Sequence, residues 1–293
     1  MKTLLLIDAN SLIHRAYHAL PEFNAPNGRP TGALYGASNI LLKILREKRP
    51  DYVAAAFDRP EPTFRDKEYA EYKGTRPQAA DELVSQIIES RRLMEMFGIK
   101  IFESAGWEAD DIIMTLANRF AEETGLKTII FSGDLDILQA VRGEKVVAEV
   151  PQKGISSTVI YDEPAVVKRF SLKPSQLPDY KGLVGDTSDN IPGVAGIGPK
   201  TAAMVINKYG PLESLYKEIE EMGLSDSKLQ KKLESHKTVA LLSKRLATLR
   251  TDAPIEADLK SLTLKEIDPK KAIPYFRDLG FGSLVAKLEY NGK

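Results

Sequence analysis

Short apolar runs alternate with amphipathic stretches through the first half of the chain. The stretches carry apolar residues at every third or fourth position, which is the helical period. Strands that alternate with helices are typical of a parallel sheet covered by helices. The first half therefore predicts an α/β core, with strands at Leu4–Ile7, Tyr52–Phe57, Lys100–Phe102, Thr128–Phe131 and Lys145–Val150.

Residues that start and stop helices separate these runs. Apolar positions from Leu34 to Ile44 predict a helix that Pro50 ends. Asp81 opens a second predicted helix, which Gly98 closes, and a third begins near Glu108.

The sequence pattern changes from about Lys181. Strand-like runs give way to short helical patterns punctuated by glycine, followed by one extended piece at Ser261–Ile267 and a helical pattern from Pro269. The segment Ile191–Gly210 holds two lysines and no acidic residue. We predict a core over residues 1–180 and a second, helical region over 181–293.

The amino-acid composition limits the kinds of functional site that the chain can form. The 293 residues include 41 basic and 41 acidic ones, 43% hydrophobic residues and no cysteine. This is ordinary for a globular protein and excludes disulfides, thiolate metal sites and cysteine nucleophiles. The longest apolar runs fall far below the roughly 20 residues of a membrane span, and Met1 to Asp8 does not resemble a signal peptide. We expect a cytoplasmic protein.

Acidic residues follow the predicted strands directly. Because the carboxyl ends of parallel strands share one edge of the sheet, these acids should converge there. A further acidic pair falls after the core. The nine candidate carboxylates are Asp8, Asp58, Glu108, Asp110, Asp111, Asp134, Asp136, Asp186 and Asp189.

Crowded carboxylates repel one another unless cations lie between them. With oxygen ligands, Mg²⁺ or Mn²⁺ fits best, and two ions roughly 3.5–4 Å apart can drive phosphodiester hydrolysis. The alternative to a metal site is a set of local roles. Glu108, Asp110 and Asp111 are also suited to the N-terminus of a helix, and Asp8 or Asp134 is suited to a turn. Their joint occurrence at one edge favours the metal site.

A glycine-rich turn precedes a predicted helix at Pro192–Ala202. Such turns expose backbone amides that bind phosphate oxygens, although a plain helix–helix turn is the alternative. The spacing does not match a nucleoside triphosphate loop. Beside the acid-free segment, the turn predicts a clamp on a duplex backbone, read without sequence preference, through Gly193, Gly196, Gly198, Lys200 and Thr201.

The segment Arg59–Pro77, with five basic and four acidic residues, follows Asp58. Lys73 and Arg76 can stabilise charge on a scissile phosphate if they point at it, and Tyr72 can stack on a base. A solvated helical segment is the alternative.

These motifs together resemble the 5′-nuclease (5′-3′ exonuclease) domain of bacterial DNA polymerase I, a member of the flap endonuclease superfamily. The likeness runs along nearly the whole chain. The matching segments are Leu6–Asn10 with Arg15, Phe57–Arg59, Phe64–Arg65, Tyr72–Arg76, Gly106–Asp111, Ser132–Asp136 and Gly185–Gly193.

The resemblance implies a PIN-like parallel-sheet nuclease core, a helical arch over about residues 59–91, and a C-terminal helix-hairpin-helix lobe elongated into a helix-three-turn-helix. It also implies that the nine acids hold two or more Mg²⁺ or Mn²⁺ ions, and that Lys73 and Arg76 lie over the scissile phosphate. Tyr72, Arg15 and the glycine turn would contact DNA, and in relatives that turn can hold K⁺.

The activity implied is a structure-selective 5′-3′ exonuclease and flap endonuclease of replication and repair. Its expected partners are branched or 5′-ended duplex DNA and RNA–DNA primer junctions. We expect a monomer in the bacterial nucleoid, fused to or acting with a DNA polymerase; an excised domain and a stand-alone nuclease fit equally. The alternatives are a non-catalytic junction-binding module and a PIN-type ribonuclease.

Overall fold

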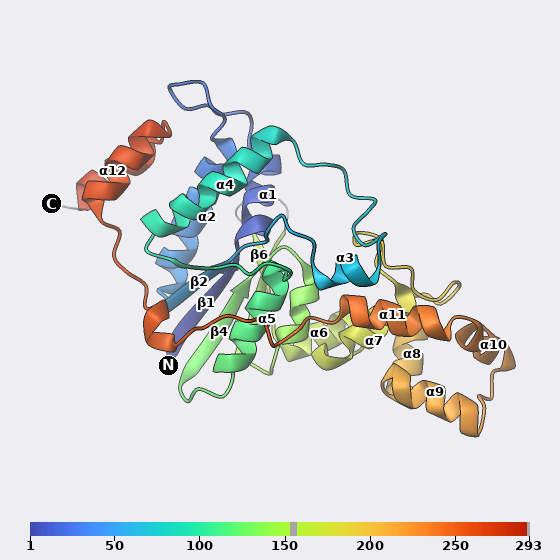
Figure 1. Cartoon of the computed structure of the whole chain (residues 1–293). Helices are drawn as coiled ribbons and strands as arrows, with labels where there is room; N and C mark the ends of the chain where they lie inside the picture. Colours follow the sequence, from blue (N-terminus) through green and yellow to red (C-terminus); the bar gives the residue numbers. More distant parts are fainter. Residues whose placement is uncertain (153–156, 292–293) are drawn as a thin grey trace.

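The computed structural model describes residues 1–152 and 157–291, and a six-stranded sheet runs through its centre (Figure 1). The strand order is β3-β2-β1-β4-β5-β6. All neighbours pair in parallel except β5 and β6, which are antiparallel. The bounds are β1 (Lys2–Asp8), β2 (Tyr52–Ala56), β3 (Lys100–Phe102), β4 (Leu126–Phe131), β5 (Val146–Pro151) and β6 (Thr158–Tyr161).

The five parallel strands confirm the sequence prediction, whereas β6 was not predicted. This four-residue strand lies at an edge, where Ile160 is exposed and Thr158 and Val159 are half-buried, although its sequence is β-prone. Residues 153–156 of the predicted core and 292–293 of the predicted second region lie outside the described residues.

The register of the central strands aligns their carboxyl ends. Asp8 lies beside Ala56 of β2, and Ile7 lies beside Phe131 of β4. The residues that follow these three strands therefore emerge at the same edge of the sheet.

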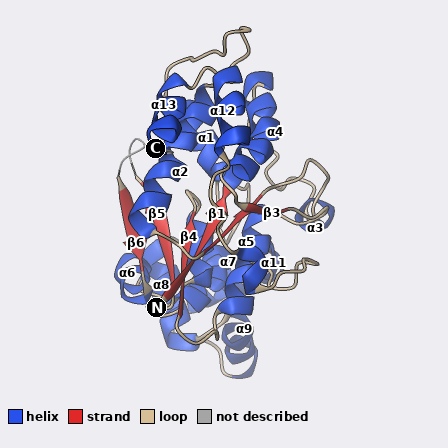
Figure 2. Ribbon diagram, turned by 90° about the vertical axis from the view of Figure 1, so that its left-hand side faces the viewer, coloured by secondary structure: helices blue, strands red, loops and turns tan. Residues whose placement is uncertain are grey.

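Helices from both ends of the chain cover one face of the sheet. Their apolar side chains form one buried cluster with Leu5 and Ile7 of β1, and Figure 2 shows these helices grouped on one side of the strands. The C-terminal helices thus pack on the α/β core. The covering helices are α1 (Ala9–Ala19), α2 (Gly32–Lys48), α4 (Asp81–Met96), α12 (Pro269–Asp278) and α13 (Gly282–Asn291).

The opposite face is covered by a second cluster that includes Leu4 and Leu6 of β1. Because β1 is buried on both faces, its residues are continuously apolar, as in other parallel sheets. The covering elements are α5 (Ala109–Phe120), η1 (Leu135–Ala140), α6 (Glu163–Phe170) and η3 (Leu259–Leu262).

A strand-free helical lobe extends from one end of the sheet, as the sequence predicted (Figure 1). Its own apolar cluster includes Leu183, Ile206, Leu212 and Leu233. Its helices are η2 (Pro174–Gln176), α7 (Leu177–Val184), α8 (Pro199–Tyr209), α9 (Leu212–Glu221), α10 (Ser227–Ser235) and α11 (Lys237–Ala247).

The segment predicted as a helical arch is only partly helical. Thr63 caps the short helix α3 (Phe64–Glu68) through a capping box with Asp66. Turns and extended chain follow until α4 begins at Asp81. The resemblance therefore predicted the place of this segment better than its secondary structure.

The predicted helix ends are confirmed. Arg49 adopts a left-handed φ of 44° directly before Pro50, and Gly98 follows α4 with a φ of 71°. The predicted extended piece at Ser261–Ile267 instead begins in η3, after which Thr263 forms an isolated bridge with Tyr52. Within residues 1–152 and 157–291, no helix has the length and apolar character needed to span a membrane.

Candidate active site

A cavity of 280 Å³ opens at the carboxyl edge of the central strands. Lys73 and Arg76 line it from the segment between α3 and α4, and His14 lines it from α1. The remaining charged residues of its wall are five of the nine predicted metal ligands: Asp8, Asp58, Glu108, Asp110 and Asp134.

Two of these carboxylates are fixed by hydrogen bonds. The Asp8 carboxylate accepts from the Ser11 backbone N–H at 2.9 Å and from the Ser132 hydroxyl at 2.7 Å. Asp58 accepts from the backbone N–H of Ala109 at 2.7 Å, at the start of α5. The same residues thus serve as local caps and as walls of the cavity, so the two interpretations of the sequence are compatible.

Asp110 differs from its neighbours, because its Oδ1 is buried and has no hydrogen-bond partner among the described residues. Burial, Asp134 and Asp8 raise the pKa of Asp110 well above its ordinary value. Burial and the nearby Asp58 likewise raise the pKa of Asp8, to about 7. A bound cation would lower the free energy of these buried, mutually repelling carboxylates.

A second cavity of 430 Å³ adjoins the first and shares Arg76 and Asp134 with it. Asp136 and Asp186 lie in its wall, and the ammonium of Lys181 forms ion pairs with both. Burial and Asp134 raise the pKa of Asp136 to about 7 against the opposing effect of Lys181.

Lys73 and Arg76 are bound to carboxylates of the site. Lys73 Nζ contacts Glu108 Oε1 at 2.5 Å, and Arg76 Nη2 contacts Asp189 Oδ1 at 2.5 Å. The backbone N–H of Lys73 also donates to the carbonyl of Asp189 at 2.9 Å. These contacts attach the segment after α3 directly to the acidic edge.

Tyr72 lies beneath these cations with only 5% of its surface exposed. Its hydroxyl donates to Asp189 Oδ2 at 2.9 Å and to Glu108 Oε2 at 3.1 Å. The structure therefore does not present the ring as an open platform for a base.

Glu108 is also tightly enclosed. Burial raises the pKa of its carboxyl, while Lys73 and then Arg65 oppose that rise.

Among residues 1–152 and 157–291, no three His, Asp or Glu side chains are already arranged around a metal position. Lys73, Arg76 and Lys181 instead neutralise the acids. The predicted ligands still fit hard divalent cations, because all their donor atoms are oxygens and the Asp110 Oδ1 has no partner in the part of the chain that the structure describes.

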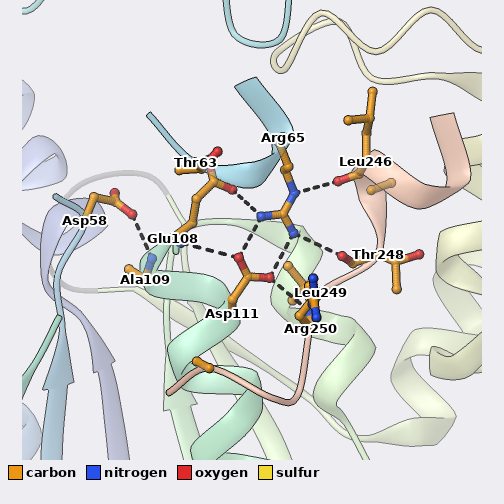
Figure 3. A network of polar contacts seen from close by, with 12 residues as sticks. Asp58, Thr63, Arg65, Glu108, Ala109, Asp111, Leu246, Thr248, Leu249 and Arg250 are labelled. Atoms are coloured by element: carbon orange, nitrogen blue, oxygen red, sulfur yellow. Dashed lines mark hydrogen bonds and ion pairs between the residues drawn. The ribbon is translucent and has the colours of Figure 1, made fainter. Parts of the chain in front are cut away.

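Two of the nine predicted ligands line neither cavity. Asp189 contacts Arg76, which lines both. Asp111 also lines neither cavity. It is fully buried and forms an ion pair with Arg65 (Figure 3). The two aspartates of the Asp110–Asp111 pair thus face different surroundings.

The predicted phosphate clamp separates into buried and exposed residues. Gly193 is buried, with a φ of 66°, and a Cβ there would lie 2.3 Å from the Gly185 backbone nitrogen. Gly196, Gly198 and Lys200 are exposed around the start of α8, and Thr201 is half-buried. Arg15, a predicted DNA contact outside this turn, is half-buried on α1.

Sequence reasoning did not single out Lys181 or His14. Lys181 occupies the last turn of α7, five residues before Asp186, and its position there was the only local signal. His14 is exposed on α1, one turn after Asn10, on the helix that begins directly after Asp8.

Comparison with known proteins agrees with this arrangement. Residues 3–171 match the family described as the 5′-3′ exonuclease N-terminal resolvase-like domain, and residues 172–270 match its C-terminal SAM fold. The chain belongs to the 5′-3′ exonuclease family. This confirms the family that the sequence motifs predicted.

Curated members of this family resemble the chain along nearly its whole length. It is 42% identical to DNA polymerase I of Bacillus subtilis over 98% of the chain and 32% of that protein. It is 37% identical to the 5′-3′ exonuclease of Aquifex aeolicus over 99% of the chain and 96% of that protein. The chain thus spans about a third of the polymerase relative.

A solved structure shares the fold. The flap endonuclease of bacteriophage T5, in a pseudo-enzyme–product complex with DNA and metal ions, matches with a TM-score of 0.69 and 20% identity. The match covers 85% of this chain and 90% of that one.

Proposed function

We propose that this 5′-3′ exonuclease family member is a structure-selective flap endonuclease and exonuclease that depends on divalent metal ions. Its substrates would be 5′ ends and branched junctions of DNA, including RNA primers. One observation carries the proposal: the Oδ1 of Asp110 is buried without a partner among the described residues, in a cavity that four further carboxylates line together with Lys73 and Arg76.

Mg²⁺ or Mn²⁺ would be held by carboxylate oxygens at two neighbouring positions. When bound, such ions supply a metal-activated hydroxide and stabilise charge on the phosphate being cleaved. The proposed ligands of the first position are Asp8, Asp58, Glu108, Asp110 and Asp134. Those of the second are Asp136 and Asp186, which line the second cavity, and Asp189, which contacts Arg76 beside it.

Lys73 and Arg76 would hold the scissile phosphate. In the structure they neutralise Glu108 and Asp189. Because divalent ions would take over that neutralisation, both side chains would become available to phosphate oxygens. Lys181 would be released from Asp136 and Asp186 in the same way.

The helical lobe would hold the duplex. Exposed backbone at Gly196 and Gly198 precedes α8, whose first turn carries Lys200 and no acidic residue. A helix N-terminus of this kind binds phosphates without reading sequence. Arg15 would contact DNA from the core, and the glycine turn would hold K⁺. Tyr72 would contact DNA only once its hydroxyl is released from Asp189 and Glu108.

The relatives support the cellular role we propose. DNA polymerase I of Bacillus subtilis is named for its polymerase, and the T5 enzyme was solved with DNA and metal ions. We propose that this chain acts as a monomer in the bacterial nucleoid, fused to or working with a polymerase. We also propose the division into a nuclease core with its arch, 1–180, and a DNA-binding lobe with a C-terminal tail, 181–293, whose helices α12 and α13 pack on the core.

The experiment that tests this function compares Asp134→Ala with Glu122→Ala, which removes an exposed acid distant from both cavities. Asp134→Ala should abolish flap cleavage in Mg²⁺ and leave junction binding in Ca²⁺ nearly unchanged, whereas Glu122→Ala should cleave normally. Junction binding without any cleavage by the wild type would favour a binding module. Equal cleavage of unstructured RNA would favour a PIN-type ribonuclease.

A further inference from the structure

Asp111 and Arg65 form a buried, two-pronged ion pair. The Nη1 and Nη2 groups of Arg65 donate to the two oxygens of Asp111 at 2.6 and 2.9 Å. Arg65 is 1% exposed and Asp111 is fully buried. Parallel contacts of this type fix the orientation of both side chains.

The guanidinium uses all its donors. Besides Asp111, it donates to the carboxylate of Glu108 at 2.9 Å and to the backbone carbonyls of Leu246 and Thr248 at 2.7 and 3.0 Å. Five N–H groups thus meet five acceptors, which is the full capacity of an arginine. Figure 3 shows that these acceptors lie in two parts of the chain: Glu108 and Asp111 at the start of α5, and Leu246 and Thr248 at the end of α11.

The Asp111 carboxylate is likewise saturated. Besides the two contacts from Arg65, it accepts from the backbone N–H of Arg250 at 2.9 Å and of Glu108 at 3.4 Å. Four donors fill the roughly four acceptor positions of a carboxylate. Its neighbour Asp110 is the opposite case, because one of its oxygens is buried with no partner among residues 1–152 and 157–291.

We infer that Asp111 is the counter-ion of Arg65 and not a metal ligand, and that the pair positions Glu108 by joining α3, α5 and the end of the helical lobe. The positioning role rests on the proposed function, because Glu108 matters to catalysis only if the cavity holds metal ions. The assignment of Asp111 as a counter-ion does not.

A buried ion pair of this kind predicts different effects on stability when one partner is replaced and when both are replaced. Removing one member of a buried pair leaves an uncompensated charge, whereas replacing both by apolar groups of similar volume does not. Arg65→Met and Asp111→Leu should therefore each lower the melting temperature strongly, and the double variant should recover most of that loss.

The decisive readout is metal binding measured by titration calorimetry with Mn²⁺ and no DNA. Asp111→Asn keeps the shape of the side chain, and we expect its Mn²⁺ dissociation constants to stay within about threefold of wild type while its melting temperature falls. Asp110→Asn is the matched control, since it removes the adjacent acid: it should weaken Mn²⁺ binding at least tenfold and leave the melting temperature unchanged or raised.

Kinetics on a flap duplex test the positioning role. The double variant should keep KM and lose at least tenfold in kcat, because Glu108 loses one of the contacts that orient it. Unchanged kcat would overturn the positioning role. A double variant that does not fold would count against a self-contained pair, and Asp111→Asn would then decide the counter-ion assignment.

Loss of Mn²⁺ affinity in Asp111→Asn equal to that in Asp110→Asn would overturn the inference. If the proposed function is wrong, the wild type will bind no Mn²⁺ and will not cleave the flap duplex. The melting temperatures of the single and double variants would still test whether Asp111 is the counter-ion of Arg65.

Discussion

Lys73 Nζ lies 2.5 Å from Glu108 Oε1, so a cation from the segment after α3 contacts a carboxylate at the start of α5. The contact places the ammonium at the cavity where we propose that phosphate is cleaved. Coulomb attraction from Glu108 and Asp189 raises the pKa of Lys73 although burial acts to lower it. The side chain is therefore charged at neutral pH.

Lys73→Ala should lower kcat for flap cleavage by about 100-fold, the order expected when one group that stabilises transition-state charge is removed. Junction affinity in Ca²⁺ should change little. Lys67→Ala is the control, because Lys67 is an exposed lysine of the same segment. Equal losses in both variants would indicate a general electrostatic effect and contradict the assigned role.

Metal binding should release protons in a manner that depends on pH. The pKa values of Asp8 and Asp136 are both raised to about 7. Groups whose pKa is raised by folding stabilise the metal-free fold below about pH 4, and that contribution is lost as pH rises through 7. Metal ions bind the deprotonated acids and should offset this loss.

The increase in melting temperature caused by Mg²⁺ should therefore be larger at pH 8 than at pH 6. Titration calorimetry in buffers of different ionisation enthalpy should show roughly one or more protons released at pH 6 and few at pH 8.5. If Mg²⁺ raised the melting temperature equally at pH 6 and pH 8, these carboxyls would not be losing protons when the metal binds.

Substitution by alanine should destabilise the fold strongly at one glycine of the proposed clamp and only slightly at another. Gly193 has a φ of 66° and a Cβ there would meet the Gly185 nitrogen at 2.3 Å, whereas Gly198 has a φ of −96° and nothing within 4 Å. Gly193→Ala should cost about 2 kcal/mol or more of unfolding free energy and Gly198→Ala less than about 0.5 kcal/mol, measured by urea denaturation. Similar losses in both would refute this distinction.

Lys200 should contribute to duplex binding through phosphate contact alone. Lys200→Ala should weaken binding equally for different duplex sequences and reduce the slope of log affinity against log salt by about 1. Lys260→Ala removes an exposed lysine outside the lobe helices and should leave the slope unchanged. A change in sequence preference would argue for base contacts instead.

The sequence predicted the parts of the fold that periodic apolar residues determine. The parallel strands and helices α2, α4 and α5 follow from such patterns. It did not predict that α12 and α13 pack against the sheet, because an amphipathic helix does not specify which apolar surface it will cover. It missed β6, which lies at the sheet edge with a half-exposed pattern.

The candidate site was predictable where residues follow aligned strands. Asp8, Asp58 and Asp134 converge because β1, β2 and β4 end at one edge. Adjacent acids on a helix were harder to separate: successive residues point about 100° apart, so Asp110 faces the cavity while Asp111 faces Arg65. The capping box that Asp111 forms with Glu108 was the local signal of that difference.

Partners distant in sequence were not predictable from spacing. Lys181 contacts Asp136, 45 positions earlier in the chain, only because α7 packs beside η1. Tyr72 is buried against Asp189 by the same kind of long-range packing.

Cleavage of a 5′-end-labelled flap duplex tests the central claim most directly, with matched single-stranded and blunt duplexes, in Mg²⁺ and in EDTA. We predict release of a short product from the flap substrate, in Mg²⁺ only, with little cutting of the single strand. Retained junction binding with no cleavage in Mg²⁺ or Mn²⁺ would contradict the account.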